Sequence, residues 1–247
     1  MSKERQKYEL LRILIESQDS IGASTLCQML KCRNLNVSSA TVGRILNEFD
    51  FEGLTVRLGY KGRILTDLGR EQFLEYRRKM EFEEFSAKLY EAVNETDPEN
   101  LINILVARRG IEREIAKLAA EQATKEDLAE IRAAYQIHFD SVKSKKHRMI
   151  TSENDVFFHR AVAKASKNII LASTYDFIWQ NGRLSPIMEY VRISVGGAIA
   201  VDHGRILAAI EAGDPEQAQE MMTVHIDSLI NDVNKYWQTK KRATRGE

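Results

Sequence analysis

Asp155 and His159 are the residues of this chain whose types and spacing best suit a binding site. They stand four positions apart in the segment Asp155-Val156-Phe157-Phe158-His159, which has a helical pattern. On an α-helix this spacing puts both side chains on one face, here the face that also carries Val162 and Ala163. The pattern therefore predicts a carboxylate and an imidazole that point together into the interior.

Two further histidines lie on the apolar faces of two later helical segments. His203 shares its face with Leu207, and His225 shares its face with Leu229. Either histidine alone is better explained by a hydrogen-bonded place in the core than by a metal. Burying three imidazoles and a carboxylate without partners, however, costs about 1–3 kcal/mol or more per group. A shared divalent ion, for which Zn²⁺, Ni²⁺ and Fe²⁺ are all suitable, satisfies these groups together. The predicted ligands are Asp155, His159, His203 and His225.

Arg108 lies on the apolar side of an earlier helical segment, one turn before Glu112. One interpretation is an ion pair between these two residues at the edge of the core. The other is a guanidinium that is offered to the carboxylate of a bound ligand, and it makes Arg108 and Glu112 candidate effector-binding residues. The remaining histidines of the second half, His138 and His147, lie on a charged helical segment and are expected at the surface.

Six helical segments are expected between residues 97 and 240, and capping residues mark several of their starts. Asp97-Pro98 and Asp214-Pro215 place a capping carboxylate before proline at the first helical position. Thr124 and Asp127 form a capping-box pattern, and Asn168 is the next cap. Ser185-Pro186 either restarts or kinks the fourth segment. Gly213 closes the fifth.

The first 80 residues have a different pattern. Three amphipathic helical segments are followed by alternating residues, Leu54 to Leu58, a glycine-rich turn and a return strand at 63–66. This layout predicts a winged helix-turn-helix. The outer face of its third helix carries short polar side chains and one arginine, which suits the major groove of DNA. The wing adds basic residues for the phosphate backbone. The candidate DNA-binding residues are Ser38, Ser39, Thr41, Arg44, Arg57, Lys61 and Arg63. An ordinary solvated helical domain, or a winged helix that binds protein, are the alternatives.

The composition limits the class of protein. The chain has 247 residues, 43% of them hydrophobic, and its apolar runs are only a few residues long. It can bury a substantial core, but no run approaches the roughly 20 apolar residues that cross a bilayer. The polar first residues lead directly into a helical pattern, so we expect a cytoplasmic protein without a signal peptide. Residues 1–80 contain 14 Lys and Arg against 10 Asp and Glu, an excess that is compatible with nucleic acid.

The head resembles the winged helix of archaeal nitrogen-assimilation repressors. The resemblance depends on the segments Gly22-Ala23-Ser24-Thr25-Leu26, Ser39-Ala40-Thr41-Val42 and Gly59-Tyr60-Lys61-Gly62-Arg63-Ile64-Leu65-Thr66, with Gly69 after them.

The second half resembles the FCD domain, the effector-binding half of a branch of GntR-type transcription regulators. The motifs are Arg108-Arg109-Gly110-Ile111-Glu112, Leu118-Ala119-Ala120, Asp155-x3-His159-Arg160-Ala161-Val162, Ala165-Ser166-Lys167-Asn168, His203-Gly204-Arg205-Ile206-Leu207-Ala208-Ala209-Ile210, Gly213-Asp214 and Met221-x3-His225. The resemblance implies an antiparallel all-helical bundle, a divalent metal on the four predicted ligands, a small organic acid beside it, and dimers. Such regulators usually carry a head with a Pro-Ser-Glu-Arg motif and an arginine-led recognition helix, and this chain lacks both.

The sequence thus predicts a mainly α protein with a winged-helix domain at 1–78, a linker helix at 79–96 and an FCD-type domain at 97–240. We expect a one-component transcription regulator without catalytic residues, whose binding to operator DNA responds to metal and to a small carboxylate. A metal sensor, in which the ion is the effector, and a metal-dependent hydrolase are the rival hypotheses.

Overall fold

The computed structural model describes residues 2–17, 19–143, 148–179, 184–195 and 201–245. It divides into two compact units, Met1–Leu89 and Tyr90–Glu247, each with its own hydrophobic core. Among the described residues, no helix combines the length and the hydropathy that crossing a membrane needs.

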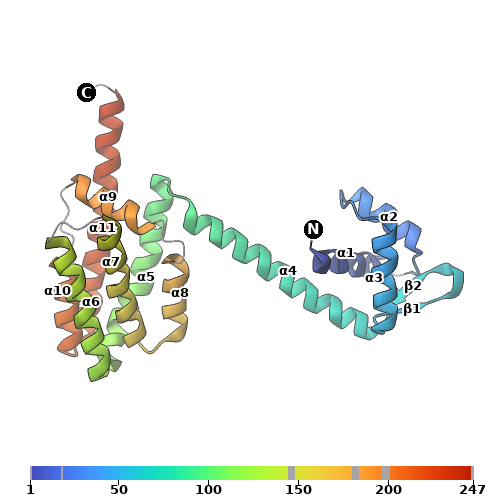
Figure 1. Cartoon of the computed structure of the whole chain (residues 1–247), viewed down its shortest axis with the longest axis horizontal. Coiled ribbons are helices and arrows are strands. Elements are labelled where there is room, and N and C mark those ends of the chain that lie inside the picture. The colour runs from blue at the N-terminus through green and yellow to red at the C-terminus, as the bar shows by residue number, and fades with distance from the viewer. Residues whose placement is uncertain (1, 18, 144–147, 180–183, 196–200, 246–247) are drawn as a thin grey trace. The chain divides into compact units, whose positions relative to one another are not determined.

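The first unit is a winged helix, as predicted. Three helices, α1 (Lys3–Glu16), α2 (Ala23–Cys32) and α3 (Ser39–Phe51), precede a hairpin of β1 (Thr55–Arg57) and β2 (Arg63–Leu65) that is joined through the short 3₁₀ helix η1 (Gly59–Lys61) (Figure 1). The strands pair antiparallel, with Val56 opposite Ile64. The inward stripe of α3 includes Val42, Ile45 and Phe49, and none of these side chains is exposed.

Local chemistry fixes the ends of these elements. The Ser38 hydroxyl accepts a hydrogen bond from the Thr41 amide at 3.1 Å and caps α3. Gly62 ends the wing turn with a φ of 111°, and a Cβ at this position would lie 2.2 Å from the carbonyl oxygen of Ile21. Only glycine therefore fits where the wing contacts the segment before α2.

The side chains of the first wing strand do not follow the predicted alternation, in which the apolar residues would face inward. Thr55 is buried and donates its hydroxyl hydrogen bond to Asp50 at 2.6 Å. Val56 and Leu58 remain 48% and 42% exposed. Thr55 of β1 therefore faces α3, because the partly buried Asp50 carboxylate supplies it with a hydrogen-bond acceptor.

Helix α4 (Asp67–Asn94) is continuous, and the boundary between the two units falls within it. Its start is tied to the wing by Thr66, whose hydroxyl accepts from the Gly69 amide and donates to the Gly53 carbonyl. The expected linker at 79–96 corresponds to the second part of α4 and the short connection that follows it. Phe82 and Phe85 of this part are 71% and 64% exposed within the single chain.

The second unit is all-helical, as predicted. Its helices are α5 (Pro98–Gln122), α6 (Lys125–Lys143), α7 (Arg148–Ala165), α8 (Ile169–Trp179), α9 (Leu184–Val195), α10 (Val201–Glu211) and α11 (Pro215–Arg245). Helix α5 packs along α11, and α6 packs along α7 (Figure 1). The core between them contains Leu105, Ile131, Phe158 and Ile226, all without exposure.

The predicted caps occur at four helix starts. Asp97 accepts hydrogen bonds at the start of α5, and Asp214 does so at the start of α11. The Thr124 amide donates to Asp127 at 2.9 Å, and the Asp127 amide donates back to the Thr124 hydroxyl at 3.2 Å. Asn168 caps α8. The range of the expected fourth segment holds two helices, α8 and α9, in line with a restart near Ser185-Pro186; residues 180–183 lie outside the described residues.

Candidate metal centre and DNA-binding surface

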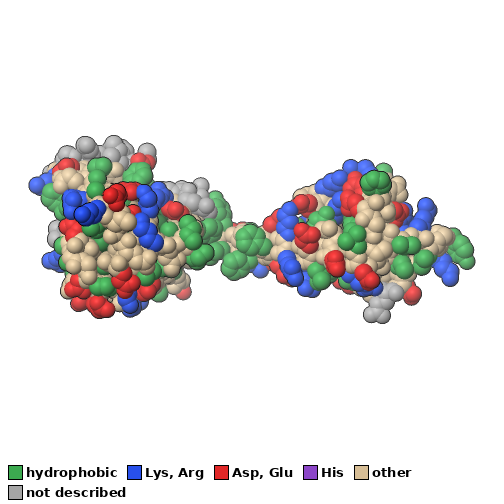
Figure 2. All heavy atoms as spheres, turned by 90° about the horizontal axis from the view of Figure 1, so that it is seen from below, with side chains coloured by type: hydrophobic (Ala, Val, Ile, Leu, Met, Phe, Trp, Pro, Cys, Tyr) green, Lys and Arg blue, Asp and Glu red, His purple; other side chains and the backbone are tan. Residues whose placement is uncertain are grey.

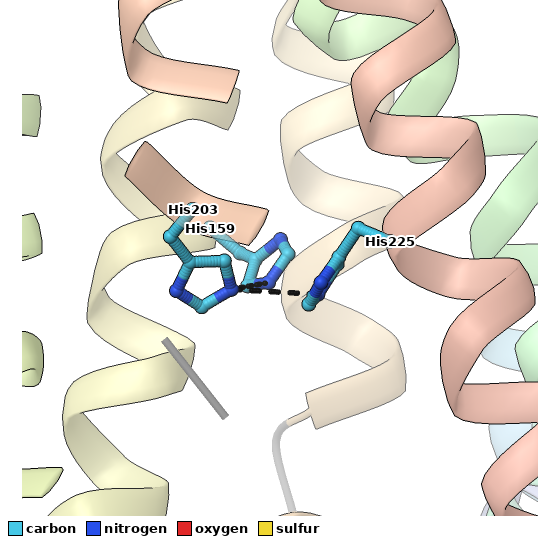
Figure 3. A group of neighbouring side chains, drawn as sticks. All are labelled: His159, His203 and His225. Atoms are coloured by element: carbon cyan, nitrogen blue, oxygen red, sulfur yellow. Dashed lines mark hydrogen bonds between the residues drawn. The ribbon is translucent and has the colours of Figure 1, made fainter. Parts of the chain in front are cut away.

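Three histidines from three helices meet inside the second unit. His159 of α7, His203 of α10 and His225 of α11 point their rings toward one another (Figure 3). The Nε2 atom of His203 lies 3.2 Å from Nε2 of His159 and 3.4 Å from Nε2 of His225. All three side chains are 2% exposed or less, so the nitrogens converge on a point that is closed to bulk water.

Two of these rings have a carboxylate near their outer nitrogen. The Nδ1 atom of His159 lies 2.6 Å from a carboxylate oxygen of Glu112, and Nδ1 of His225 lies 3.6 Å from a carboxylate oxygen of Asp202. Because a carboxylate only accepts, the 2.6 Å contact favours a proton on Nδ1 of His159 and a lone pair on its Nε2. The 3.6 Å separation at His225 is longer than a hydrogen bond, so Asp202 acts on that ring through its charge.

The charge states favour the same chemistry. Burial lowers the pKa of His203 well below its usual value, and it lowers the pKa of His225 to about 4. Both rings are thus neutral near pH 7, and neutral imidazole is the form that binds a metal ion. Neutral donors that crowd one point are satisfied by a cation, so the residues present fit a divalent ion.

Asp155 completes the predicted set. Its carboxylate oxygen lies 3.5 Å from Nε2 of His203, and its position one turn before His159 on α7 brings it to the same centre. Burial opposes its ionisation, but the neighbouring imidazoles outweigh burial, and the pKa of Asp155 is lowered. The carboxylate of Asp155 therefore lies beside His203, in a group with His203 and His138 whose ligand atoms are all within 4.8 Å of one another, next to the group of His159, His203 and His225.

The neighbouring Arg108 is part of the wall of this centre. It is 2% exposed, its Nε contacts Glu112, and its Nη2 lies 3.3 Å from the second carboxylate oxygen of Glu112. The guanidinium also stacks on Trp179, 4.6 Å from the ring centre. Burial disfavours the charge of Glu112, but Arg108 and His159 outweigh it and hold the pKa of Glu112 at about 2. The i,i+4 pair that the sequence suggested is thus present, but deep in the core and not at its edge.

His138 corrects the expectation of a surface position. Its side chain has no exposed area, and its Nδ1 lies 3.0 Å from Nδ1 of His203. The reason is that α6 packs against both α7 and α10, and Gly204 leaves room there for Tyr135. The seven-residue spacing from buried Ile131 was the available sequence signal. His147 lies outside the described residues.

The winged helix presents most, but not all, of its predicted DNA-binding residues. Ser38, Ser39, Arg44, Arg57 and Lys61 are exposed, and Thr41 is partly exposed. Charged side chains of both signs are scattered over the visible faces of the units, among hydrophobic and other groups, and none of the described histidines can be seen there (Figure 2).

Arg63 is the exception, and its expected role on the wing surface is corrected. It is 6% exposed, and it forms a bidentate ion pair with Asp50 at 2.8–2.9 Å. Its charge is used inside the domain to fasten β2 to α3. Tyr60 was not among the predicted contacts, although it is 98% exposed at the end of the wing.

This architecture, a winged helix followed by a helical domain around buried histidines, is that of a ligand-responsive DNA-binding regulator. The model of the FCD domain matches residues 103–228, which is half of the chain. The chain belongs to the FCD-domain branch of the GntR-family transcription regulators. The model of the ribonuclease R winged-helix domain matches residues 8–73.

Relatives and a solved structure agree with this family. The chain is 28% identical to the L-lactate dehydrogenase operon regulatory protein of Escherichia coli strain K12 over 193 residues, 76% of this chain and 73% of the relative. It is 30% identical over 131 residues to the Uxu operon transcriptional regulator of the same strain, 51% of each chain. The fold is similar to that of a GntR-family regulator from Pseudomonas syringae pv. tomato, with a TM-score of 0.50, 14% identity, and coverage of 91% of this chain and 79% of that chain.

A shorter similarity concerns the class of regulator that the head resembles. Over 69 residues, 28% of this chain and 21% of the relative, the chain is 36% identical to the global nitrogen regulator NrpRI of Methanosarcina mazei. The chain is therefore similar in sequence to two classes of transcription regulator. The two Escherichia coli relatives, which match 193 and 131 residues of this chain, are transcription regulators and not enzymes.

Proposed function

We propose that the helical domain of this regulator binds one divalent ion through Asp155, His159, His203 and His225, and that a small carboxylate effector binds beside the ion. The observation that supports this proposal is the convergence of three buried imidazoles: Nε2 of His203 lies 3.2 Å from Nε2 of His159 and 3.4 Å from Nε2 of His225, and a carboxylate lies near the outer nitrogen of His159 and of His225. When bound, the ion would supply positive charge and open coordination positions for an anionic ligand.

The surrounding residues prepare this site. Glu112 holds His159 in the metal-binding tautomer, and Arg108 keeps Glu112 ionised. Phe158 stacks on the ring of His203 with 4.3 Å between the ring centres and restrains its orientation. Arg108 and Glu112 remain our candidates for the effector-facing wall, because their charges lie next to the ligand set.

The class of effector follows from charge and from one relative. A cationic centre in a buried site selects a small anion, and the relative named above for an L-lactate dehydrogenase operon points to a small hydroxy acid. We propose that effector binding changes the affinity of the winged helix for operator DNA. A homodimer would present two such heads to a two-fold operator.

The first test is the metal content per subunit of the purified chain, measured by plasma mass spectrometry after loading with Zn²⁺ or Ni²⁺. We expect one ion per subunit, and its loss in His203→Ala. Calorimetry with L-lactate should then give binding only to the loaded protein, with lactamide as the matched control that lacks the carboxylate. Failure of the loaded wild type to retain any ion would refute the metal site.

A second measurement separates this proposal from a metal sensor. A DNA duplex selected from a random pool is titrated with the protein at fixed metal and varied L-lactate, and then at fixed L-lactate and varied metal. Under our proposal the affinity follows the carboxylate as long as the site is loaded. If the affinity follows the metal alone, the ion is the effector.

A further inference from the structure

The outer partner of His203 differs in kind from those of the other two histidines. Glu112 and Asp202 serve His159 and His225 as carboxylates, whereas His203 faces the imidazole of His138 at 3.0 Å. His138 is fully buried, and its Nε2 has no hydrogen-bond partner among the described residues. A fourth buried imidazole thus lies at hydrogen-bond distance from a proposed metal ligand, and one of its ring nitrogens also lies within 4.8 Å of an Asp155 carboxylate oxygen.

The contact between two neutral imidazoles requires one donor and one acceptor. If His138 donates, the proton of His203 lies on its inner nitrogen, which suits the 3.2 and 3.4 Å contacts with the lone pairs of His159 and His225. If His138 accepts, His203 carries its proton on Nδ1 and presents a lone pair inward. Only the second arrangement leaves all three inner nitrogens as metal donors.

We propose that His138 is a positioning residue of the metal centre, which accepts the Nδ1 proton of His203 when the site is loaded. This inference rests on the proposed metal site and assigns to His138 the part that carboxylates play for the other two rings. The change between the two arrangements balances. On loading, His203 releases its Nε2 proton to solvent and accepts at Nδ1 the proton that leaves Nδ1 of His138, and His138 takes one proton from solvent at Nε2, so that each ring keeps one proton.

The test compares His138→Asn with His138→Leu. Asparagine places an amide oxygen near the position of Nδ1 and can accept from His203, whereas leucine fills the space without an acceptor. Binding of Co²⁺ is followed by its visible absorption. We expect His138→Leu to bind Co²⁺ about 10–100-fold more weakly and His138→Asn to recover most of the affinity. Ile131→Val, a buried change two turns earlier on α6, is the control for a general packing defect and should leave the affinity unchanged.

A measurement on the unchanged chain does not depend on the folding of a variant. In the Zn²⁺-loaded protein, long-range ¹H–¹⁵N spectra of the imidazoles should show His138 protonated at Nε2 and His203 protonated at Nδ1. Wild-type affinity in a folded His138→Leu variant, equal losses in both variants, or a proton on Nδ1 of His138 in the loaded protein would each overturn the inference. If the wild type binds neither Co²⁺ nor Zn²⁺, the metal site itself fails, and the role of His138 fails with it.

Discussion

Glu112 is the residue on which most of the local charge balance depends. It is 1% exposed and lies between the guanidinium of Arg108 and the ring of His159. Glu112→Gln removes the countercharge and leaves a buried guanidinium, a type of change that costs about 3–5 kcal/mol. We therefore expect a loss of this order in the urea unfolding free energy of the helical domain, together with weaker Co²⁺ binding. Glu121→Gln, at an exposed position of the same helix, should change stability by less than about 0.5 kcal/mol; an equal effect of both variants would contradict the assignment.

Alanine substitutions of two basic wing residues, Lys61 and Arg63, should have different effects, one on DNA binding and the other on stability. Arg63→Ala leaves the partly buried Asp50 without its partner, so the winged helix should lose about 2 kcal/mol of stability. Lys61→Ala should leave stability within about 0.5 kcal/mol. It should weaken DNA binding and reduce the slope of log affinity against log salt by about 1 if Lys61 contacts one phosphate. Urea unfolding and salt-dependent fluorescence anisotropy measure the two effects, and wild-type DNA affinity in Lys61→Ala would remove this residue from the DNA-binding set.

The sequence predicted correctly which side chains point into the core where the spacing within one helix decides it. The four-residue spacing of Asp155 and His159 places both on the buried face of α7 whatever the partner helices are. His138 was misjudged because charged neighbours on α6 suggest an outer face, while the packing of α6 against α10 decides its burial. Arg63 was misjudged for the same kind of reason, since its acceptor Asp50 is a tertiary neighbour.

At the scale of elements, the start of α6 combines a capping box with an ion pair. The Asp127 carboxylate accepts from the Thr124 amide and also contacts Lys167. The hydrogen bond from Lys167, and then the bond from the Thr124 backbone, lower the pKa of Asp127 to about 2. Since its pKa in the unfolded chain is about 3.9, the stabilisation is fully present above about pH 4 and is lost as the pH falls toward 2.

Asp127→Asn tests this dependence. We expect the variant to be about 1 kcal/mol less stable than wild type at pH 7, and the difference to shrink as both are unfolded in urea at pH 4, 3 and 2.5. Asp140→Asn on the same helix is the control for a general change of charge. A difference that stays constant down to pH 2.5 would show that the cap acts through shape alone.

Helix starts were the elements that the sequence predicted best, because a cap is a contact between residues three positions apart or fewer. The start of α9 was harder to predict, since Ser185-Pro186 allows either a kink or a restart. The faces of β1 could not be predicted from alternation, because the hydrogen bond from Thr55 to the partly buried Asp50 decides which side of this three-residue strand faces α3. The three inner nitrogens meet only through the packing of α7, α10 and α11, which no single segment encodes.

At the scale of the whole molecule, the two units keep separate hydrophobic cores. The core of the winged helix contains Leu10, Leu26 and Phe49, and the core of the helical domain contains Leu105 and Ile206. The proposed ligands all belong to the second unit. Binding of the ion should therefore stabilise the second unit directly. It should affect the winged helix only through the coupling free energy between the metal site and the DNA-binding site.

Calorimetric melting of the full chain with and without Zn²⁺ measures that coupling. An ion at 100 times its dissociation constant stabilises its unit by about 2.7 kcal/mol, which corresponds to a rise of about 5–10 °C in its melting temperature. We expect the melting temperature of the helical domain to rise by this amount and that of the winged helix to change far less. The coupling of about 1–3 kcal/mol changes the affinity for DNA, and it adds no contacts to the core of the winged helix. His203→Ala should abolish the shift. A single transition that moves as one with Zn²⁺ would contradict separate cores and would mean that the two units unfold together.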